Sequence, residues 1–240
     1  MKRYRHLFFD LDHTLWDFRT NSRDTLTELF HEHDFPGRGI ADVHEFIGAY
    51  EEINAELWRG YSAGRMDKDV LRVLRFRNAL LQFGVKDDKL ARSVGDEYIE
   101  RCPRKQALMP GALEVLDQLR GRFALHIVTN GFQETQHTKL RSSGLEEYFV
   151  ATITSEQAQA RKPDGRIFAY ALRKAKAAAE ASIMIGDDVN ADINGARNAG
   201  WDQVLFDPHS NHAGAEATHR IRDLRELIDL LDHDGSASKT

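Results

Sequence analysis

The sequence predicts an α/β fold, in which a doubly wound parallel sheet carries an inserted α-helical bundle. Two observations support this prediction. The apolar run at residues 7–9 has the length and composition of a buried strand, and it ends in two acids, Asp10 and Asp12. After Pro110 and Gly111, strand-like and helical segments alternate, which is typical of parallel sheets with right-handed crossovers.

The first strand is predicted to end at a reactive site, because two carboxylates follow it directly. Residues two apart on an extended chain point the same way, so Asp10 and Asp12 lie on one side. Two unit charges about 4 Å apart repel by roughly 4 kcal/mol at an effective dielectric of about 20. A bound cation or a shared proton must therefore stabilise the pair.

Residues 16–106 are predicted to form the helical bundle, because they have helical periods and no convincing strand. Apolar residues at helical spacing mark the first two helices: Leu26, Leu29 and Phe30, then Phe46, Tyr50, Ile53 and Leu57. A third helix begins after Asp67 as its N-cap and stops at Gly84, and a fourth spans residues 88–101.

The remainder of the chain is predicted to build the sheet and its covering helices. The expected strands are 124–128, 150–153, 182–185 and 203–206, and the expected helices are 112–119, 133–142, 166–178, 190–199 and 224–231. The strand at residues 7–9 should join the same sheet. We therefore divide the chain into a core of residues 1–15 and 107–233, an insertion of residues 16–106, and a small polar tail, 234–240, that is predicted to be disordered.

Composition excludes several classes of partner. The net charge is -5 and the basic residues are scattered, so we expect no nucleic acid polymer as a partner. No segment approaches the ~18 consecutive apolar residues of a membrane helix, so we expect no membrane partner. The single cysteine, Cys102, cannot form an internal disulfide, and we expect a cytoplasmic protein.

Polar residues gather after four predicted strands, and open parallel sheets bind ligands beyond the carboxyl ends of their strands. These residues are Asp10, Asp12 and Thr14; Thr129, Asn130 and Gly131; Lys162, Pro163 and Asp164; and Gly186, Asp187, Asp188 and Asp192. In this order they resemble the DxDxT, TNG, KPD and GDDxxxD motifs of the haloacid dehalogenase (HAD) phosphohydrolase superfamily. The resemblance covers essentially the whole chain. It implies a Rossmann-like core, with the insertion at the position of a C1 cap domain.

The resemblance also implies a Mg²⁺-dependent phosphomonoesterase that acts through an aspartyl-phosphate. Asp10 would be the nucleophile, and Asp12 would protonate the leaving group and then activate water. Thr129 and Asn130 would donate hydrogen bonds to phosphate oxygens, and Lys162 would bring a positive charge to the site. Such phosphoryl transfer requires an in-line nucleophile, a proton donor and positive charge around the transferring group.

The metal ligands implied by the resemblance are Asp10, the backbone carbonyl of Asp12, and Asp187. Magnesium prefers such hard oxygen ligands. Asp188 is expected to act through a metal-bound water, although an N-cap of the following helix is an alternative interpretation of this residue. Asp192 is expected to be structural or to orient Lys162.

The run at residues 14–18 and the proportions of the cap resemble the YjjG-type branch of pyrimidine 5'-nucleotidases. This resemblance implies a small phosphorylated metabolite as substrate, a pyrimidine nucleoside monophosphate, and a monomer or homodimer. Trp16, Phe18, Trp58 and Tyr61 are candidates for stacking on a base, but aromatic residues at helical spacing more often form core. The alternatives are another small-metabolite phosphatase, for phosphoglycolate or a sugar phosphate, a β-phosphoglucomutase-like phosphomutase, and a noncatalytic binding protein.

Overall fold

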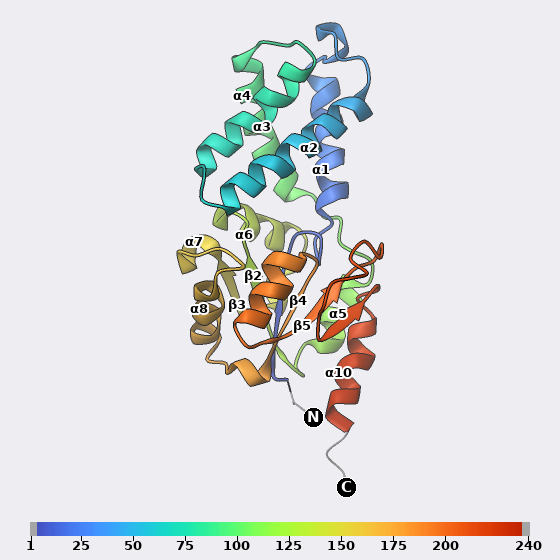
Figure 1. The fold of residues 1–240 in the computed structure, drawn as a ribbon. Coiled ribbons are helices and arrows are strands. Elements are labelled where there is room, and N and C mark those ends of the chain that lie inside the picture. The colour runs from blue at the N-terminus through green and yellow to red at the C-terminus, as the bar shows by residue number, and fades with distance from the viewer. Residues whose placement is uncertain (1–3, 237–240) are drawn as a thin grey trace. The chain divides into compact units, whose positions relative to one another are not determined.

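A computed structural model describes residues 4–236, and the chain separates into two compact units (Figure 1). One unit comprises Met1–Phe18 and Gln106–Thr240, and the other comprises Arg19–Lys105. Among the described residues, no helix has both the length and the apolar character needed to cross a membrane.

The first unit is built on a six-stranded sheet in which every paired strand is parallel, with the order β3-β2-β1-β4-β5-β6. The strands are β1 (His6–Phe9), β2 (Ala124–Thr129), β3 (Ala151–Thr154), β4 (Ser182–Gly186), β5 (Asp202–Phe206) and β6 (His219–Ile221). The first strand joins this sheet at its centre, as predicted, between β2 and β4. The sequence analysis did not predict β6, a three-residue strand that begins with two polar residues.

Both faces of the central strands are covered. Leu7, Phe8 and Phe9 of β1 and Ile183, Met184 and Ile185 of β4 are all fully buried. Phe8 and Met184 pack in one core cluster with Phe168 and Trp201. Since neighbouring side chains on a strand point to opposite faces, the sheet is buried on both sides, as parallel sheets are.

The helices of this unit follow the predicted order with two differences: the short helix at residues 155–158 was not predicted, and the predicted helix at residues 190–199 is a π-helical segment followed by a short α-helix. They are α5 (Ala112–Leu119), α6 (Gln133–Ser142), α7 (Ser155–Ala158), α8 (Gly165–Ala175), a π-helical segment (Val189–Asn194), α9 (Gly195–Asn198) and α10 (Glu226–Ser236). α8 ends three residues earlier than predicted, at a C-cap, Lys176, that has the left-handed φ of 52°. The predicted disordered tail begins at Asp234, but α10 continues to Ser236, and residues 237–240 lie outside the described residues.

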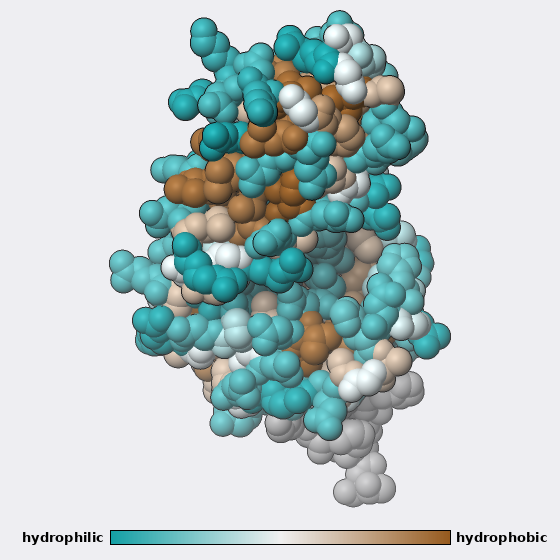
Figure 2. Space-filling view, turned by 45° about the horizontal axis from the view of Figure 1, so that its top comes forward, coloured by the Kyte–Doolittle hydropathy of each residue, from teal (hydrophilic) through white to brown (hydrophobic). Residues whose placement is uncertain are grey.

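The second unit contains α2 (Val43–Ser62), α3 (Lys68–Gln82), α4 (Asp88–Arg101) and most of α1 (Phe18–Glu32). Its interior is aromatic: Phe30, Phe35, Phe46, Tyr50 and Phe76 are each at most 2% exposed. Apolar side chains also reach its surface, since Val70, Val73 and Leu81 of α3 are exposed, and Figure 2 shows apolar residues gathered over this unit. Asp67 occupies the N-cap position of α3, but its side chain makes no capping hydrogen bond.

Candidate active site

The ends of three neighbouring strands bring the predicted motifs together. Phe9, the last residue of β1, is in register with Ile127 of β2 and with Ile185 of β4. The backbone N–H of Asp10 donates to the carbonyl of Ile185 at 2.9 Å, so Asp10 continues the sheet by one residue. The residues that follow these strands therefore lie at one edge of the sheet, the carboxyl edge, where open parallel sheets bind ligands.

The Lys162 ammonium bonds residues from three different segments at this edge of the sheet. Its ammonium Nζ donates to Asp10 Oδ1 at 2.7 Å, to Asp192 Oδ1 at 2.6 Å and to the Val128 carbonyl at 2.8 Å. Asn130 fixes the loop that carries this lysine, because its side-chain Oδ1 accepts from Lys162 N at 2.8 Å and its Nδ2 donates to Lys162 O at 2.9 Å. The structure thus gives the Asn130 side chain a positioning contact that the sequence analysis did not anticipate. The expected contact of Lys162 with Asp192 is present.

Two carboxylates, Asp10 and Asp192, share this lysine, and a third, Asp187, lies beside them. Asp10, Asp187 and Asp192 each offer an oxygen, and these three oxygens all lie within 4.8 Å of one another. The negative charge of the three carboxylates exceeds the single charge of Lys162. The donor set consists of hard carboxylate oxygens, so the cluster fits a divalent cation such as Mg²⁺.

The pKa values in this cluster reflect crowding and burial. Burial raises the pKa of Asp10, although the charge and hydrogen bond of Lys162 act against it. Burial, followed by the charge of Asp10, raises the pKa of Asp187 to about 7. Burial also raises the pKa of Asp192. Burial lowers the pKa of Lys162, but the charges of Asp10 and Asp192 outweigh it and raise that pKa, so the lysine stays protonated.

Asp188 and Asp192 have different surroundings. Asp188 Oδ1 accepts from the backbone N–H groups of Asn190 and Ala191, each at 2.8 Å, so Asp188 caps the π-helical segment. Asp192 reaches the acidic cluster instead. A Cβ atom on Gly186 would lie 2.3 Å from Asp192 Oδ2, so the missing side chain of Gly186 allows this close approach. The capping interpretation of Asp188 is therefore the one that its contacts support.

Asp12 lies among different partners from Asp10. Lys139 Nζ donates to Asp12 Oδ1 at 2.5 Å, and Gln136 Nε2 donates to Asp12 Oδ2 at 2.8 Å. Burial by itself would raise the pKa of Asp12, but the charge of Lys139 and these two hydrogen bonds outweigh it and hold that pKa below its ordinary value. Gln136 Nε2 also donates to Thr129 Oγ1 at 3.1 Å.

Lys139 and Gln136 were not among the predicted site residues. The available signal was their spacing, since residues three apart lie on one face of a helix, and this helix follows the Thr-Asn-Gly turn at the carboxyl edge of the sheet. Neither residue belongs to the four motifs. Their importance depends on which way α6 faces, and that orientation was not predicted.

The turn after β1 completes the site. Thr14 Oγ1 donates to Asp187 Oδ1 at 2.9 Å and so links the first motif to the fourth. His13 has a φ of 64°, in the left-handed region. Histidine is one of the few residues other than glycine that is enriched in this region, which accounts for its place in this turn.

The aromatic candidates divide between the two units. Trp16 is fully buried in the first unit, and the Lys139 ammonium lies 4.4 Å from its ring centroid. The same ammonium lies 5.3 Å from the ring centroid of Phe18. In the second unit, Tyr61 is 3% exposed and packs edge-to-face against Trp58 at 5.4 Å. Trp16 and Tyr61 are therefore core residues.

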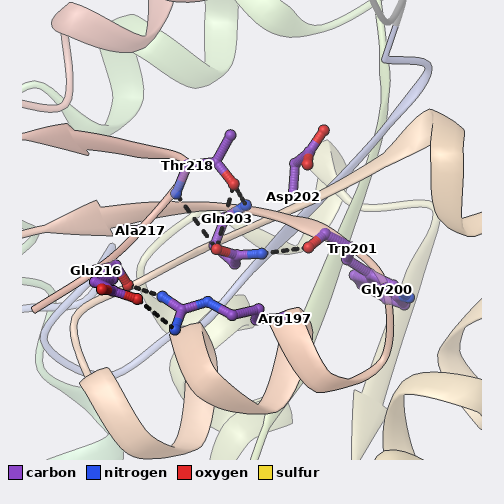
Figure 3. Close-up of a pocket in the computed structure, with 8 residues that line it drawn as sticks. All are labelled: Arg197, Gly200, Trp201, Asp202, Gln203, Glu216, Ala217 and Thr218. Atoms are coloured by element: carbon purple, nitrogen blue, oxygen red, sulfur yellow. Dashed lines mark hydrogen bonds and ion pairs between the residues drawn. The ribbon is translucent and has the colours of Figure 1, made fainter.

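A pocket of about 450 Å³ lies elsewhere in the first unit (Figure 3). Its lining consists of Arg197, Gly200, Trp201, Asp202, Gln203, Glu216, Ala217 and Thr218. These residues include the first residues of β5, so the pocket lies at the amino end of that strand, whereas Asp10 follows the carboxyl end of β1. Polar side chains that line this pocket are paired with one another: Arg197 forms an ion pair with Glu216, and Gln203 forms hydrogen bonds with Trp201 and Thr218. The candidate active site is therefore the acidic cluster.

Comparisons with known proteins identify the family of this chain. The chain is 34% identical to the pyrimidine 5'-nucleotidase PynA of Streptococcus pneumoniae, over 95% of each chain. It is 31% identical to the pyrimidine 5'-nucleotidase YjjG of Escherichia coli, over 94% of this chain and 96% of that one. The crystal structure of the HAD-hydrolase YfnB of Bacillus subtilis, described as bound to magnesium, is 32% identical with a TM-score of 0.87, and covers 96% of this chain and 100% of that chain. A family model described as haloacid dehalogenase-like hydrolase matches residues 4–200. The chain therefore belongs to the haloacid dehalogenase-like hydrolase family.

Proposed function

We propose that this protein is a Mg²⁺-dependent phosphomonoesterase that hydrolyses pyrimidine nucleoside 5'-monophosphates. The observation that carries the proposal is the convergence of Asp10, Asp187 and Lys162, which are far apart in the sequence, at one edge of the sheet. The similarity to two pyrimidine 5'-nucleotidases over nearly the whole chain supports the choice of substrate. The proposal includes a cytoplasmic monomer or homodimer and a cap role for the inserted helical unit.

Asp10 is the nucleophile of the proposed reaction. Lys162 binds Asp10 Oδ1, so the other carboxylate oxygen attacks phosphorus. A bond forms between that oxygen and phosphorus as the bond from phosphorus to the nucleoside oxygen breaks, and Asp12 gives a proton to the departing oxygen. Water then attacks phosphorus, Asp12 takes a proton from this water, and inorganic phosphate leaves Asp10.

Other residues bind charge around the phosphoryl group. Lys162 stays protonated because its pKa is raised by two carboxylates that outweigh the effect of burial. Thr129 Oγ1 accepts from Gly131 N at 3.0 Å and from Gln136, so its hydroxyl hydrogen can donate to a phosphate oxygen. Thr14 orients Asp187 through its hydrogen bond.

Magnesium fits the donor set of this site. Asp10, Asp187 and the backbone carbonyl of Asp12 would hold the ion, and the carboxylates leave negative charge that Lys162 alone does not balance. When bound, the ion would neutralise phosphate charge in the transition state. Asp188 stays a candidate for a contact through a metal-bound water.

Phosphate release from a substrate panel tests the proposal. The purified protein with Mg²⁺ is given dUMP, UMP and dTMP beside glucose 6-phosphate and phosphoglycolate. We expect the pyrimidine nucleotides to have the highest kcat/KM, and Asp10→Asn to abolish release. Asp96→Asn, on the exposed face of α4, is the matched control and should keep full activity.

The outcomes separate the alternatives. Preference for phosphoglycolate or a sugar phosphate would replace the nucleotidase assignment and keep the phosphatase. A phosphomutase would convert glucose 1-phosphate to its isomer without releasing phosphate. Equal rates for the wild type and Asp10→Asn would remove the enzyme mechanism altogether.

A further inference from the structure

We propose that Lys139 and Gln136 are positioning residues, which hold the carboxylate of Asp12 in one orientation for proton transfer. This inference rests on the proposed function, in which Asp12 gives a proton to the leaving oxygen and later takes one from water. Lys139 and Gln136 lie outside the four motifs. They reach the reaction only through the side chain of Asp12 and, for Gln136, that of Thr129.

Two donors fix the plane of the Asp12 carboxylate. Lys139 Nζ bonds Oδ1 at 2.5 Å, and Gln136 Nε2 bonds Oδ2 at 2.8 Å. A carboxylate held by one donor can still turn about its final side-chain bond, whereas separate donors on the two oxygens remove that rotation. Both donors come from α6, three residues apart, so one helix face sets both contacts.

The position of Lys139 is itself constrained. The residue is 4% exposed, and its ammonium lies 4.4 Å from the ring centroid of Trp16 and 5.3 Å from that of Phe18. Aromatic faces attract a cation at this range. Trp16 belongs to the same turn as Asp12, since His13 N donates to the Trp16 carbonyl at 3.0 Å. The acid and the ring that orients its lysine are therefore parts of one short segment.

Stability alone is a poor account of this ion pair, in which Lys139 is buried and the Asp12 side chain is 24% exposed. Replacing a buried ion pair with apolar residues of similar volume is often neutral or stabilising. A lysine at 4% exposure beside one carboxylate therefore needs a reason other than fold stability. Orientation of a residue that transfers protons provides that reason.

Gln136 joins proton transfer to phosphate binding. Its Nε2 donates to Asp12 Oδ2 at 2.8 Å and to Thr129 Oγ1 at 3.1 Å, so one amide contacts both groups. A Cβ atom on Gly131 would lie 1.6 Å from Gln136 Nε2. Glycine at position 131 is therefore required for Gln136 to occupy this place.

The dependence of rate on the leaving group distinguishes positioning from a general structural role. A misplaced Asp12 impairs protonation of the leaving oxygen, which a basic leaving group needs and a weakly basic one does not. The comparison is kcat/KM for phenyl phosphate and for 2,4-dinitrophenyl phosphate, because this parameter reports steps up to the departure of the leaving group. For Lys139→Met we expect a loss of about tenfold or more with phenyl phosphate and less than about threefold with the dinitrophenyl ester.

Conservative and surface variants provide the controls. Lys139→Arg keeps the charge and the donors, and should recover part of the activity on phenyl phosphate. Lys174→Met removes an exposed lysine from α8 and should match the wild type on both esters. Gln136→Leu should lose more activity on phenyl phosphate than on the dinitrophenyl ester, with any loss common to both esters reporting its contact with Thr129. This difference decides the question if Lys139→Met does not fold, as judged by thermal unfolding.

Equal losses on both esters, or no loss on either, would overturn the inference and leave the phosphatase assignment intact. Inactivity of the wild-type protein would instead bear on the proposed function. No hydrolysis of any phosphate ester by the wild-type protein with Mg²⁺ would remove the proposed function, and with it the role of Asp12. The two failures are therefore distinguishable by one set of assays.

Discussion

Asp10 and Asp12 stand two residues apart, each is paired with a buried lysine, and yet their pKa values move in opposite directions. Burial acts to raise the pKa of both. It prevails at Asp10, where Lys162 is shared, and it is overcome at Asp12, where Lys139 contacts that acid. Sharing of Lys162 between two carboxylates accompanies the raised pKa of Asp10, whereas Lys139 and the Gln136 hydrogen bond lower that of Asp12.

The charge and the contacts around each acid, rather than the direction of its pKa shift, suit the role proposed for it. Asp187 and Asp192 add negative charge beside Asp10. The surroundings of Asp10 therefore favour a bound cation. The side of Asp12 is balanced within the protein by Lys139, and its carboxylate is held by two directional contacts. One side is thus suited to attract an ion, and the other is suited to keep an acid in place.

Removing the shared lysine is the strongest way to test this comparison. Lys162→Met leaves three neighbouring carboxylates without their ammonium, and breaking a buried ion pair costs about 3 kcal/mol of unfolding free energy. We expect kcat/KM to fall by about a hundredfold or more on weakly basic and basic leaving groups alike. Steady-state kinetics with both phenyl esters and urea unfolding measure these losses. A loss confined to phenyl phosphate, like the one expected for Lys139→Met, would mean that the two lysines have the same role. That result would contradict the comparison.

The difference in pH-dependent stability between the wild type and Asp187→Asn tests the crowded side. Asp187 has a pKa of about 7 in the folded protein, against an ordinary value of 3.8, so between these two values the folded state binds more protons than the unfolded state. Asp187 should therefore make stability without metal fall as pH rises through this window, on the order of 4 kcal/mol in all, since one unit of pKa shift corresponds to about 1.4 kcal/mol. Urea unfolding in EDTA across this range measures the slope.

Asp187→Asn is the matched control for that slope, because the amide does not titrate. The variant should have a flatter dependence than the wild type over the same window. Equal slopes for the wild type and Asp187→Asn would contradict the raised pKa assigned to Asp187, because burial lowers the pKa of His126 to about 4 and so gives a slope of the opposite sign in both proteins.

Substitution of Asp188 tests whether this residue acts together with the acidic cluster. It has the smallest expected effect. Its contacts are those of an N-cap, so Asp188→Ala should lower the unfolding free energy by about 1 kcal/mol, and Asp188→Asn should lower it little. If Asp188 also acts through a metal-bound water, the asparagine variant will need more Mg²⁺ for half-maximal activity. An unchanged Mg²⁺ requirement would limit the residue to capping.

Residues at strand ends could be predicted from the sequence. Asp10, Lys162 and Asp187 follow strands or their connections, and the parallel arrangement brings such positions to a common edge whatever the packing details. The first strand joined the sheet and α4 has the predicted bounds. These successes rest on hydrophobic periodicity and on strand direction, both of which are local properties or general rules.

Contacts that depend on packing could not be predicted in the same way. Lys139 reaches Asp12 only because α6 turns that face inward, and no local pattern specifies this rotation. The contact of Asp192 with Lys162 was predicted, but the closeness of Asp192 to Asp10 and Asp187 was not, and Asp192 lies in a π-helical segment, residues 189–194. β6 escaped detection because its polar first residues, His219 and Arg220, hide a strand that contributes one fully apolar position, Ile221.

The central place of β1 has a consequence for biosynthesis. The strand that carries Asp10 is made first, yet its neighbours are β2, which follows the whole helical insertion, and β4, at residues 182–186. A growing polypeptide on the ribosome therefore holds this strand with both edges open until β2 emerges, and with one edge open until β4 does. Catalytic competence is acquired late in translation, and a truncated product that stops before Ser182 would expose a bare strand edge to other chains.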